Sequence, residues 1–159
     1  AQLINKVIPQ TKFIIAKSPN LDTQVYQDVC KNFSLDLKII DGKTHDCLNM
    51  AEVSLVCSGT ATLEAAIIQK PFAIVYKTNI FNYLLYRPQV KIPYIGMVNI
   101  VAGKQVVPEF IQFNANPKKI ADSILKFLQD PLTANRLAQE LAQVTNKLGA
   151  PGAADRNGP

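Results

Sequence analysis

The stretch that decides the fold runs from Glu52 to Tyr76 and reads EVSLVC-SGT-ATLEAAIIQ-KP-FAIVY. Its first six residues form a short, largely apolar run, and a glycine turn then leads directly into a helical pattern over Ala61–Gln69. Pro71 ends that pattern, and Phe72–Tyr76 is a second apolar run. Apolar runs without polar alternation are typical of parallel strands that helices cover on both faces. The stretch therefore predicts a strand–helix–strand unit of an α/β protein.

The flanking sequence continues this alternation between strand and helix periods. Upstream, it predicts strands at Thr11–Lys17 and Asp36–Ile40 and a helical turn at Thr44–Ala51. A helix is predicted between the two strands, because apolar residues recur there at helical spacing: Leu21, Val25, Val29 and Phe33. Downstream, a short helix fits Ile80–Tyr86. Two closing helices are predicted to start at the capping pairs Asn116-Pro117 and Asp130-Pro131. The predicted fold is α/β, a doubly wound, Rossmann-like parallel sheet with flanking helices.

Length and composition predict one domain with a sizeable core, since the chain has 159 residues, of which 48% are hydrophobic and 18% charged. It begins at Ala1 and ends in a glycine- and proline-rich stretch over 149–159, so we expect a piece of a larger protein with a flexible tail. Three cysteines without Cys-x-x-Cys spacing indicate a reducing, cytosolic setting and no disulfide scaffold. A single histidine, His45 in a polar turn, argues against a zinc site and against a histidine-dependent hydrolase.

The positive charge of the chain gathers in one stretch. No acidic residue lies between Glu64 and Glu109, and the cations within equal the whole net charge of +5: Lys70, Lys77, Arg87, Lys91 and Lys104. Most of the tyrosines lie in the same stretch. A negatively charged partner is therefore expected here. Nucleic acid is disfavoured as that partner, because the stretch is apolar and shows no nucleic-acid-binding module.

The first candidate site is the turn Ser58–Glu64, because ligands of doubly wound sheets bind where a strand feeds a helix N-terminus. Gly59 lets the backbone approach a ligand closely, and free N–H groups at a helix start favour phosphate. Thr60 and Thr62 add hydroxyl groups, and Glu64 is placed to accept from ribose hydroxyls. The same residues also suit an ordinary strand–helix turn. The pattern is neither a Gly-x-Gly-x-x-Gly fingerprint nor a Walker loop, which argues against a dinucleotide oxidoreductase or an ATPase.

The second candidate site is the segment Pro93–Glu109, which is expected to be an apolar loop of low charge. Loops of this composition are usually tucked against the protein, where their few polar groups fix a ligand. The candidates are its two glycines, Gly96 and Gly103, its asparagine, Asn99, and its one carboxylate, Glu109. The alternative is a buried connector in which Asn99 caps the backbone and Glu109 lies at the surface.

Four strings of the chain resemble lipid-A-disaccharide synthases in order and spacing: SGTATLEAA over 58–66, KPFAIVYK over 70–77, KIPYIG over 91–96 and NIVAGKQVVPE over 99–109. The segment LGAPGAADR over 148–156 is similar to the lead-in to that family's last helix. The final Asn157-Gly-Pro159 departs from the pattern. The resemblance covers most of Thr11 to Leu148.

This resemblance implies an inverting glycosyltransferase built from two Rossmann halves, the GT-B type. Such an enzyme transfers 2,3-diacylglucosamine from its UDP derivative to 2,3-diacylglucosamine 1-phosphate (lipid X), forming lipid A disaccharide 1-phosphate. Residues 1–159 would then be the C-terminal, UDP-sugar-binding half. The acceptor half, which holds an unidentified general base, would be absent, so the chain alone would be inactive. The resemblance also implies that UDP-sugar is a substrate and that neither a metal nor another cofactor is needed.

On matching positions, the resemblance places Ser58, Gly59, Thr60 and Thr62 at the diphosphate and Glu64 at the ribose. Asn99, Gly103 and Glu109 would face the donor sugar or the nucleotide. The family implies the bacterial cytoplasm, at the cytoplasmic face of the inner membrane. The basic, aromatic stretch Ile80–Lys91 would meet that membrane or the partner half, and a homodimer of the intact enzyme is also open.

Two alternatives remain open from the sequence. One is another GT-B enzyme acting on a UDP-sugar, of the lipid II transferase or the epimerase type. The other is a non-catalytic assembly module, in which the apolar stretch Tyr94–Glu109 and the last helix form a subunit contact.

Overall fold

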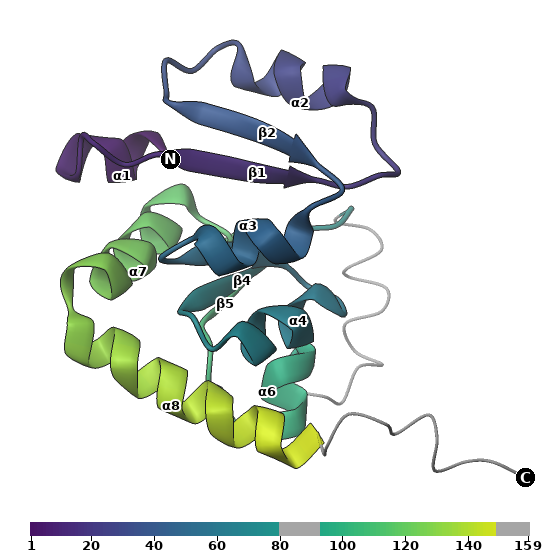
Figure 1. Cartoon of the computed structure of the whole chain (residues 1–159), viewed down its shortest axis with the longest axis vertical. Coiled ribbons are helices and arrows are strands. Elements are labelled where there is room, and N and C mark those ends of the chain that lie inside the picture. Colours follow the sequence, from purple (N-terminus) through teal and green to yellow (C-terminus); the bar gives the residue numbers. More distant parts are fainter. Residues whose placement is uncertain (80–92, 149–159) are drawn as a thin grey trace, which may run out of the picture.

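Parallel strands in two separate sheets form the framework of the computed structural model, which describes residues 1–79 and 93–148 (Figure 1). β1 (Phe13–Lys17) pairs with β2 (Leu37–Asp41). The second sheet has the order β3 (Ser54–Cys57), β4 (Phe72–Tyr76) and β5 (Glu109–Ile111). The predicted α/β class, with parallel strands flanked by helices, is confirmed. The expected single sheet is divided in two, because no hydrogen-bonded ladder joins β1 to β3.

Helices separate and cover these strands. Their bounds are α1 (Gln2–Val7), α2 (Thr23–Cys30), α3 (Thr44–Met50), α4 (Ala61–Ile68), α6 (Met97–Ala102), α7 (Pro117–Gln129) and α8 (Pro131–Leu148), with a 3₁₀ turn, η2, over Gln112–Asn114. The sequence did not predict the short elements α1, α6 and β5. The helix expected at Ile80–Tyr86 and the tail over 149–159 lie outside the described residues.

Both closing helices start where the sequence predicts. The Asn116 side chain accepts hydrogen bonds from the backbone N–H groups of Lys118 and Lys119, and Pro117 is the first residue of α7. Asp130 does the same for α8, where its carboxylate accepts from the hydroxyl and the backbone N–H of Thr133. These hydrogen bonds lower the pKa of the Asp130 carboxyl, because they stabilise its charged form.

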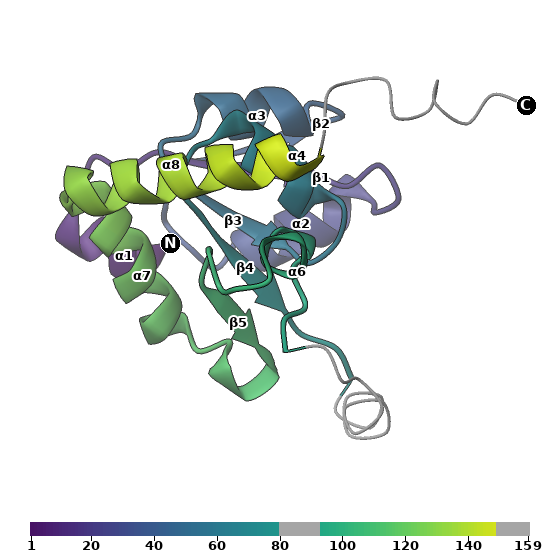
Figure 2. The same ribbon diagram turned by 90° about the horizontal axis from the view of Figure 1, so that it is seen from below.

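The core lies on the two faces of the second sheet. In β4, Phe72, Ala73 and Ile74 are all buried, as the continuous apolar run predicts. α4, α6 and α8 pack over one face, where α8 lies against both other helices (Figure 2). α1 and α7 cover the other face around Ala73.

α2 forms as predicted but lies outside this core. The predicted apolar stripe of Leu21, Val25, Val29 and Phe33 is about half exposed, and only Val25 and Val29 of it lie within α2, which has no buried residue. Figure 1 shows α2 beside β2, at the far side of the first sheet from α8. The periodicity identified the helix correctly, but it does not reveal what the apolar face contacts.

The length of α8 allows a test of this packing with two leucines on one helix. Leu141 is fully buried against α4 and α6, whereas Leu132 is 81% exposed. Leu141→Ala should lower the free energy of unfolding by about 2–5 kcal/mol, because it leaves a cavity in the core. Leu132→Ala should change it by less than about 0.5 kcal/mol. Urea denaturation followed by circular dichroism measures both, and equal effects would contradict this description of the core.

Candidate functional site

The turn between β3 and α4 lies at the carboxyl edge of the second sheet. The Ser58 backbone N–H donates to the carbonyl of Val75 in β4, at 3.1 Å, which holds the turn against the end of that strand. Gly59 has φ +145°, a backbone conformation that side-chain-bearing residues rarely adopt, and a β-carbon added there would meet no atom within 4 Å. Glycine is therefore required here by the backbone, and it leaves the turn accessible to a ligand.

The start of α4 presents unused hydrogen-bond donors. Among the described residues, no acceptor contacts the backbone N–H groups of Gly59, Thr60 and Ala61. The Thr62 hydroxyl donates to the Gly59 carbonyl at 2.8 Å and is fully buried, so it closes the turn from inside. Thr60 and Glu64 are exposed. Unpaired N–H groups at a helix start carry partial positive charge and favour an anion.

The segment Pro93–Glu109 is a folded connection, which corrects the expectation of a loop. It contains α6 and enters β5 at Glu109. The Glu109 carboxylate accepts from the backbone N–H groups of Ile95 and Gly96, each at 2.9 Å, and so caps the start of α6. The side chain is partly buried. The helix was missed because it has only six residues, fewer than two turns, and its cap lies far along the chain.

Asn99 is fully buried and uses every hydrogen-bonding position of its amide. Nδ2 donates to the Val107 carbonyl at 2.9 Å and to Glu109 Oε1 at 2.8 Å. Oδ1 accepts from the N–H groups of Val106 at 2.8 Å and of Val107 at 3.0 Å. The side chain therefore ties α6 to the approach to β5. It has no free donor or acceptor to offer a ligand.

The two candidate sites meet through the start of α6. The Ser58 hydroxyl donates to the Ile95 carbonyl at 3.2 Å, so the Ser58 turn and the Glu109 cap lie side by side. Between them, Gly96 has no room for a β-carbon, which would collide with Ile74 and lie 3.1 Å from Glu109 Oε1. Gly103 ends α6 at φ +70°. It lies at the opposite end of that helix and is not brought to the Ser58 turn.

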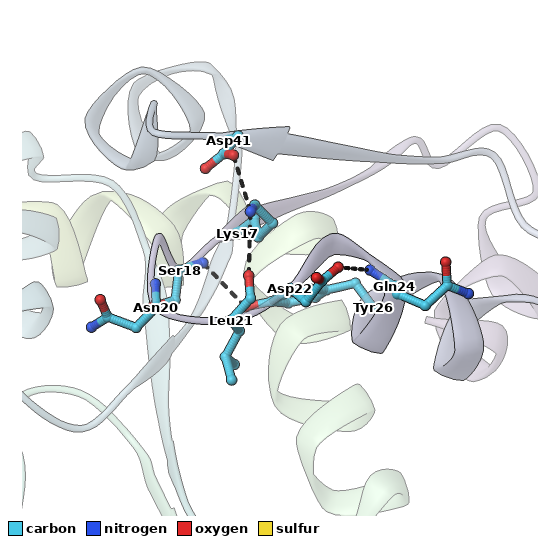
Figure 3. Close-up of polar contacts among 8 residues, drawn as sticks. All are labelled: Lys17, Ser18, Asn20, Leu21, Asp22, Gln24, Tyr26 and Asp41. Carbon is cyan, nitrogen blue, oxygen red and sulfur yellow. Dashed lines mark hydrogen bonds and ion pairs between the residues drawn. The ribbon is translucent and has the colours of Figure 1, made fainter.

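A second polar cluster lies at the carboxyl edge of the first sheet (Figure 3). The Lys17 ammonium, buried at the end of β1, pairs with the Asp41 carboxylate at 3.0 Å and donates to the Leu21 carbonyl at 3.2 Å. The Ser18 N–H donates to the Tyr26 hydroxyl at 3.1 Å. These contacts close the connection from β1 to α2. A lysine at a strand end carries no sequence signal of this role, and the sequence did not identify it.

Gln112 is a further residue that the sequence missed, and it lies where β5 ends. Its side chain accepts from the Thr78 N–H at 2.7 Å and donates to the Thr78 carbonyl at 3.0 Å, which joins the ends of β4 and β5. Its backbone is strained, with φ +46°. A pocket of about 410 Å³ opens beside it, lined by Lys77, Thr78, Phe113, Ala115, Asn116 and Pro117. No local pattern distinguishes this glutamine.

Neither a metal-binding cluster nor a membrane-spanning helix is present in the part of the chain that the structure describes. No three histidine, cysteine or acidic side chains there lie close enough together to hold a metal ion. Over residues 1–79 and 93–148, no helix is both long and apolar enough to cross a membrane.

A family model and several similar relatives indicate the same family for this chain. The family model for lipid-A-disaccharide synthetase matches residues 1–153. The lipid-A-disaccharide synthase of Syntrophus aciditrophicus is 38% identical over 157 residues, which are 98% of this chain and 41% of that relative. Those of a Sulfurihydrogenibium species and of Geobacter sulfurreducens are 36% and 32% identical, each over 98% of this chain and over 43% and 41% of their own lengths. This chain belongs to the lipid-A-disaccharide synthetase family.

The chain spans about two fifths of the length of these relatives. Two of the strings that carry the resemblance to lipid-A-disaccharide synthases fall on the features described above. The first is the Ser58 turn with α4, and the other runs from α6 to Glu109. The family resemblance and the carboxyl-edge geometry therefore concern the same residues.

The cations of the basic stretch that the structure describes do not form one free surface. Lys70 donates to the Asn49 carbonyl, and Lys104 pairs with Glu140 at 2.7 Å. Lys77 is exposed beside the Gln112 pocket. Arg87 and Lys91 lie outside the described residues. Of the three described cations between Glu64 and Glu109, only Lys77 forms no such contact, and it lies at the carboxyl edge.

The Glu109 cap can be tested by comparing the same change, glutamate to glutamine, at Glu109 and at a control position, Glu140. Glu109→Gln replaces a carboxylate oxygen with an NH₂ group that faces N–H donors, so it should lower the free energy of unfolding by about 1–3 kcal/mol. Glu140→Gln removes only the charge of a surface ion pair and should cost less than about 1 kcal/mol. Thermal and urea unfolding measure both variants. A Glu109 variant as stable as the Glu140 variant would disprove the capping role.

Proposed function

We propose that this chain is the C-terminal, nucleotide-sugar-binding half of a lipid-A-disaccharide synthase. The observation that carries the proposal is the set of unpaired N–H groups at the start of α4, which lies at the carboxyl edge of a parallel sheet. This feature falls on the string SGTATLEAA, which resembles that family. A helix start of this kind suits the diphosphate of a UDP-sugar.

Within this site, we assign the diphosphate to the unpaired backbone N–H groups of Gly59, Thr60 and Ala61 and to the Thr60 hydroxyl. Ser58 is assigned to the turn itself, because its backbone N–H donates to the Val75 carbonyl and its hydroxyl to the Ile95 carbonyl. Glu64 is exposed one turn along α4 and is assigned to the ribose hydroxyls. Thr62 is assigned to the turn itself, because its hydroxyl is already bound to the Gly59 carbonyl.

The Asn99–Glu109 pair is assigned to positioning. Both side chains are engaged with the protein, and together they fix the backbone at Ile95, which the Ser58 hydroxyl contacts. Gly103 receives no contact with the diphosphate, since it lies at the other end of α6. The donor sugar would then lie near the exposed turn, between Gly59 and the start of α6.

The proposed reaction is the transfer of 2,3-diacylglucosamine from UDP to 2,3-diacylglucosamine 1-phosphate. An acceptor hydroxyl oxygen forms the new bond to the sugar C1 with inversion, the bond from C1 to the UDP oxygen breaks, and the hydroxyl proton passes to a general base. UDP leaves as an anion, and the α4 N–H groups stabilise the charge that develops on it. We propose that these donors meet the need without a metal ion or other cofactor. The base and most acceptor contacts would lie in residues beyond this chain.

The substrates would carry acyl chains, so we propose that the intact enzyme works at the cytoplasmic face of the bacterial inner membrane. The residues proposed for the membrane, or for contact with the other half, are the basic and aromatic stretch Ile80–Lys91. A homodimer of the intact enzyme belongs to the same proposal.

Neither alternative has comparable support. Another UDP-sugar enzyme would share the helix-start geometry, but the family match is to lipid-A-disaccharide synthetase. An assembly module would need the apolar residues of Tyr94–Glu109 at the surface. Val98 and Val107 of that segment are instead fully buried within the chain, and of its large apolar residues only Met97 and Ile100 are exposed, at 37% and 42%.

UDP binding tests the site directly. Titration calorimetry should detect UDP binding to this chain, and Thr60→Ala and Glu64→Ala should each raise the Kd by about tenfold through loss of a hydrogen bond to the ligand. Glu52→Ala is the control, because Glu52 is exposed just before β3 begins, at the opposite edge of the sheet. Equal UDP affinity of the parent chain and all three variants would show that UDP does not bind at this turn.

A turnover assay tests whether the general base lies outside this chain. This chain alone should bind UDP yet form no disaccharide from UDP-2,3-diacylglucosamine and lipid X, because the general base is proposed to lie elsewhere. A radiolabelled product assay, with the intact Syntrophus aciditrophicus relative as the positive control, measures it. Disaccharide formation by this chain would place the base within residues 1–159.

A further inference from the structure

A pocket separate from the Ser58 turn lies where β4 and β5 end. It has a volume of about 410 Å³ and lies beside η2, which follows β5 and precedes α7 (Figure 2). Two of the residues that line it, Asn116 and Pro117, lie at the start of α7, which covers the face of the sheet around Ala73. The Ser58 turn instead leads into α4, on the opposite face. The volume is within the range of small-molecule sites.

The backbone beside this pocket is held in one position. Tyr76 is the last β4 residue in register with β5, where it pairs with Ile111. The Gln112 side chain extends this pairing, because it accepts from the Thr78 N–H at 2.7 Å and donates to the Thr78 carbonyl at 3.0 Å. Lys77 lies between these two anchored positions. Gln112 itself has φ +46°, and strained backbone of this kind persists only where its surroundings hold it, as they do at ligand sites.

Hydrogen-bond donors gather in the pocket without acceptors. Three of them have no partner among the described residues: the Lys77 ammonium, the Thr78 hydroxyl and the side-chain NH₂ of Asn116. Asn116 uses only its Oδ1 atom, which caps α7. No acidic side chain of the described residues lines the pocket. Donors in this arrangement favour an anion with several oxygen atoms.

A second ammonium group lies close to the pocket. Lys119 Nζ donates at 3.2 Å to Oδ1 of Asn114, the η2 residue between the lining residues Phe113 and Ala115. With Lys77, it gives this end of the sheet two positive charges. A phosphate monoester carries about 1.5 to 2 negative charges at pH 7, whereas a carboxylate or a sulfate ester carries one. The charge of the pocket therefore suits a phosphate monoester best.

An aromatic ring adds an apolar surface to these donors. Phe113 lines the pocket and is 77% exposed, so most of its ring has no partner within the chain. An exposed apolar surface beside a polar pocket is typical of a site for a ligand with an apolar part. The pocket thus offers contacts to both parts of an amphiphilic anion.

We propose that the pocket beside Gln112 binds a phosphate monoester that carries an apolar group. The phosphate oxygens accept from Lys77, Thr78 and Asn116, and the apolar group packs on Phe113. This inference concerns a site separate from the nucleotide site and does not rest on the proposed function. The acceptor of the proposed reaction, 2,3-diacylglucosamine 1-phosphate, is one compound of this class, and that assignment alone would rest on the proposed function.

The test uses octyl phosphate below its micellar concentration, and titration calorimetry at fixed ionic strength measures its Kd. Octyl sulfate and octyl glucoside have the same alkyl chain but a smaller charge or none. Glucose 1-phosphate is a soluble phosphate monoester without the chain. Octyl phosphate should bind at least about tenfold more tightly than each of these three compounds, because it alone supplies both the doubly charged phosphate and the apolar group.

Two pairs of matched variants locate the site. Lys77→Met should raise the Kd for octyl phosphate by about tenfold, whereas Lys104→Met, which removes the same charge from the ion pair with Glu140, should change it by less than about twofold. Phe113→Ser should raise the Kd by about fivefold, whereas Leu132→Ser, at another exposed apolar side chain, should not. Unchanged circular dichroism and thermal midpoints verify that the variants fold.

Four results would overturn this site. The first is the absence of octyl phosphate binding. The second is an equal loss of affinity in the Lys77 and Lys104 variants, which would reduce the binding to a general attraction of anions by a basic chain. The third is equal affinity for octyl sulfate or octyl glucoside, and the fourth is equal affinity for glucose 1-phosphate, which would give the pocket to a soluble phosphate ester. UDP is titrated separately, so failure of the proposed function leaves these outcomes unaffected.

Discussion

The need to pair polar groups inside an apolar connection governs the architecture of the second sheet. The backbone N–H groups of Ile95 and Gly96 and the amide of Asn99 enter a region filled by Val98, Val107 and Ile74. A single carboxylate, Glu109, accepts from all three. Without that carboxylate, buried donors would lack partners at a cost of about 1–3 kcal/mol each. The start of α6, the first residue of β5 and the contact with Ser58 all depend on this arrangement.

Much of the fold follows from local sequence. β4 occupies the predicted Phe72–Tyr76, because an apolar run bounded by a proline and a polar segment has few other structures open to it. The starts of α7 and α8 follow from cap-and-proline pairs, which act within one turn. α6 and β5 could not be predicted in this way. Their lengths of six and three residues are too short for a periodic pattern, and the groups that stabilise them come from distant positions.

The candidate sites also contain some features that local sequence predicts and others that it does not. The Ser58 turn was predictable, because a strand, a glycine and a helix start follow one another in sequence. The sequence left Asn99 open between facing a ligand and capping the backbone, and the structure shows its amide fully engaged with backbone and Glu109. Whether a side chain has all its hydrogen-bond donors and acceptors occupied depends on its neighbours in the folded structure. No sequence pattern reveals it. The same reason explains why Lys17 and Gln112 were missed.

The hydrogen bond from Ser58 to Ile95 has a thermodynamic consequence. It makes the conformation of the turn and the formation of α6 parts of one linked equilibrium. A ligand that required the ordered turn would then also favour the ordered helix, and by reciprocity local opening of α6 would lower the affinity for that ligand. Through the amide of Asn99, this equilibrium also includes the backbone at Val106 and Val107. A ligand bound at the proposed site would therefore be expected to stabilise a helix with which it makes no contact.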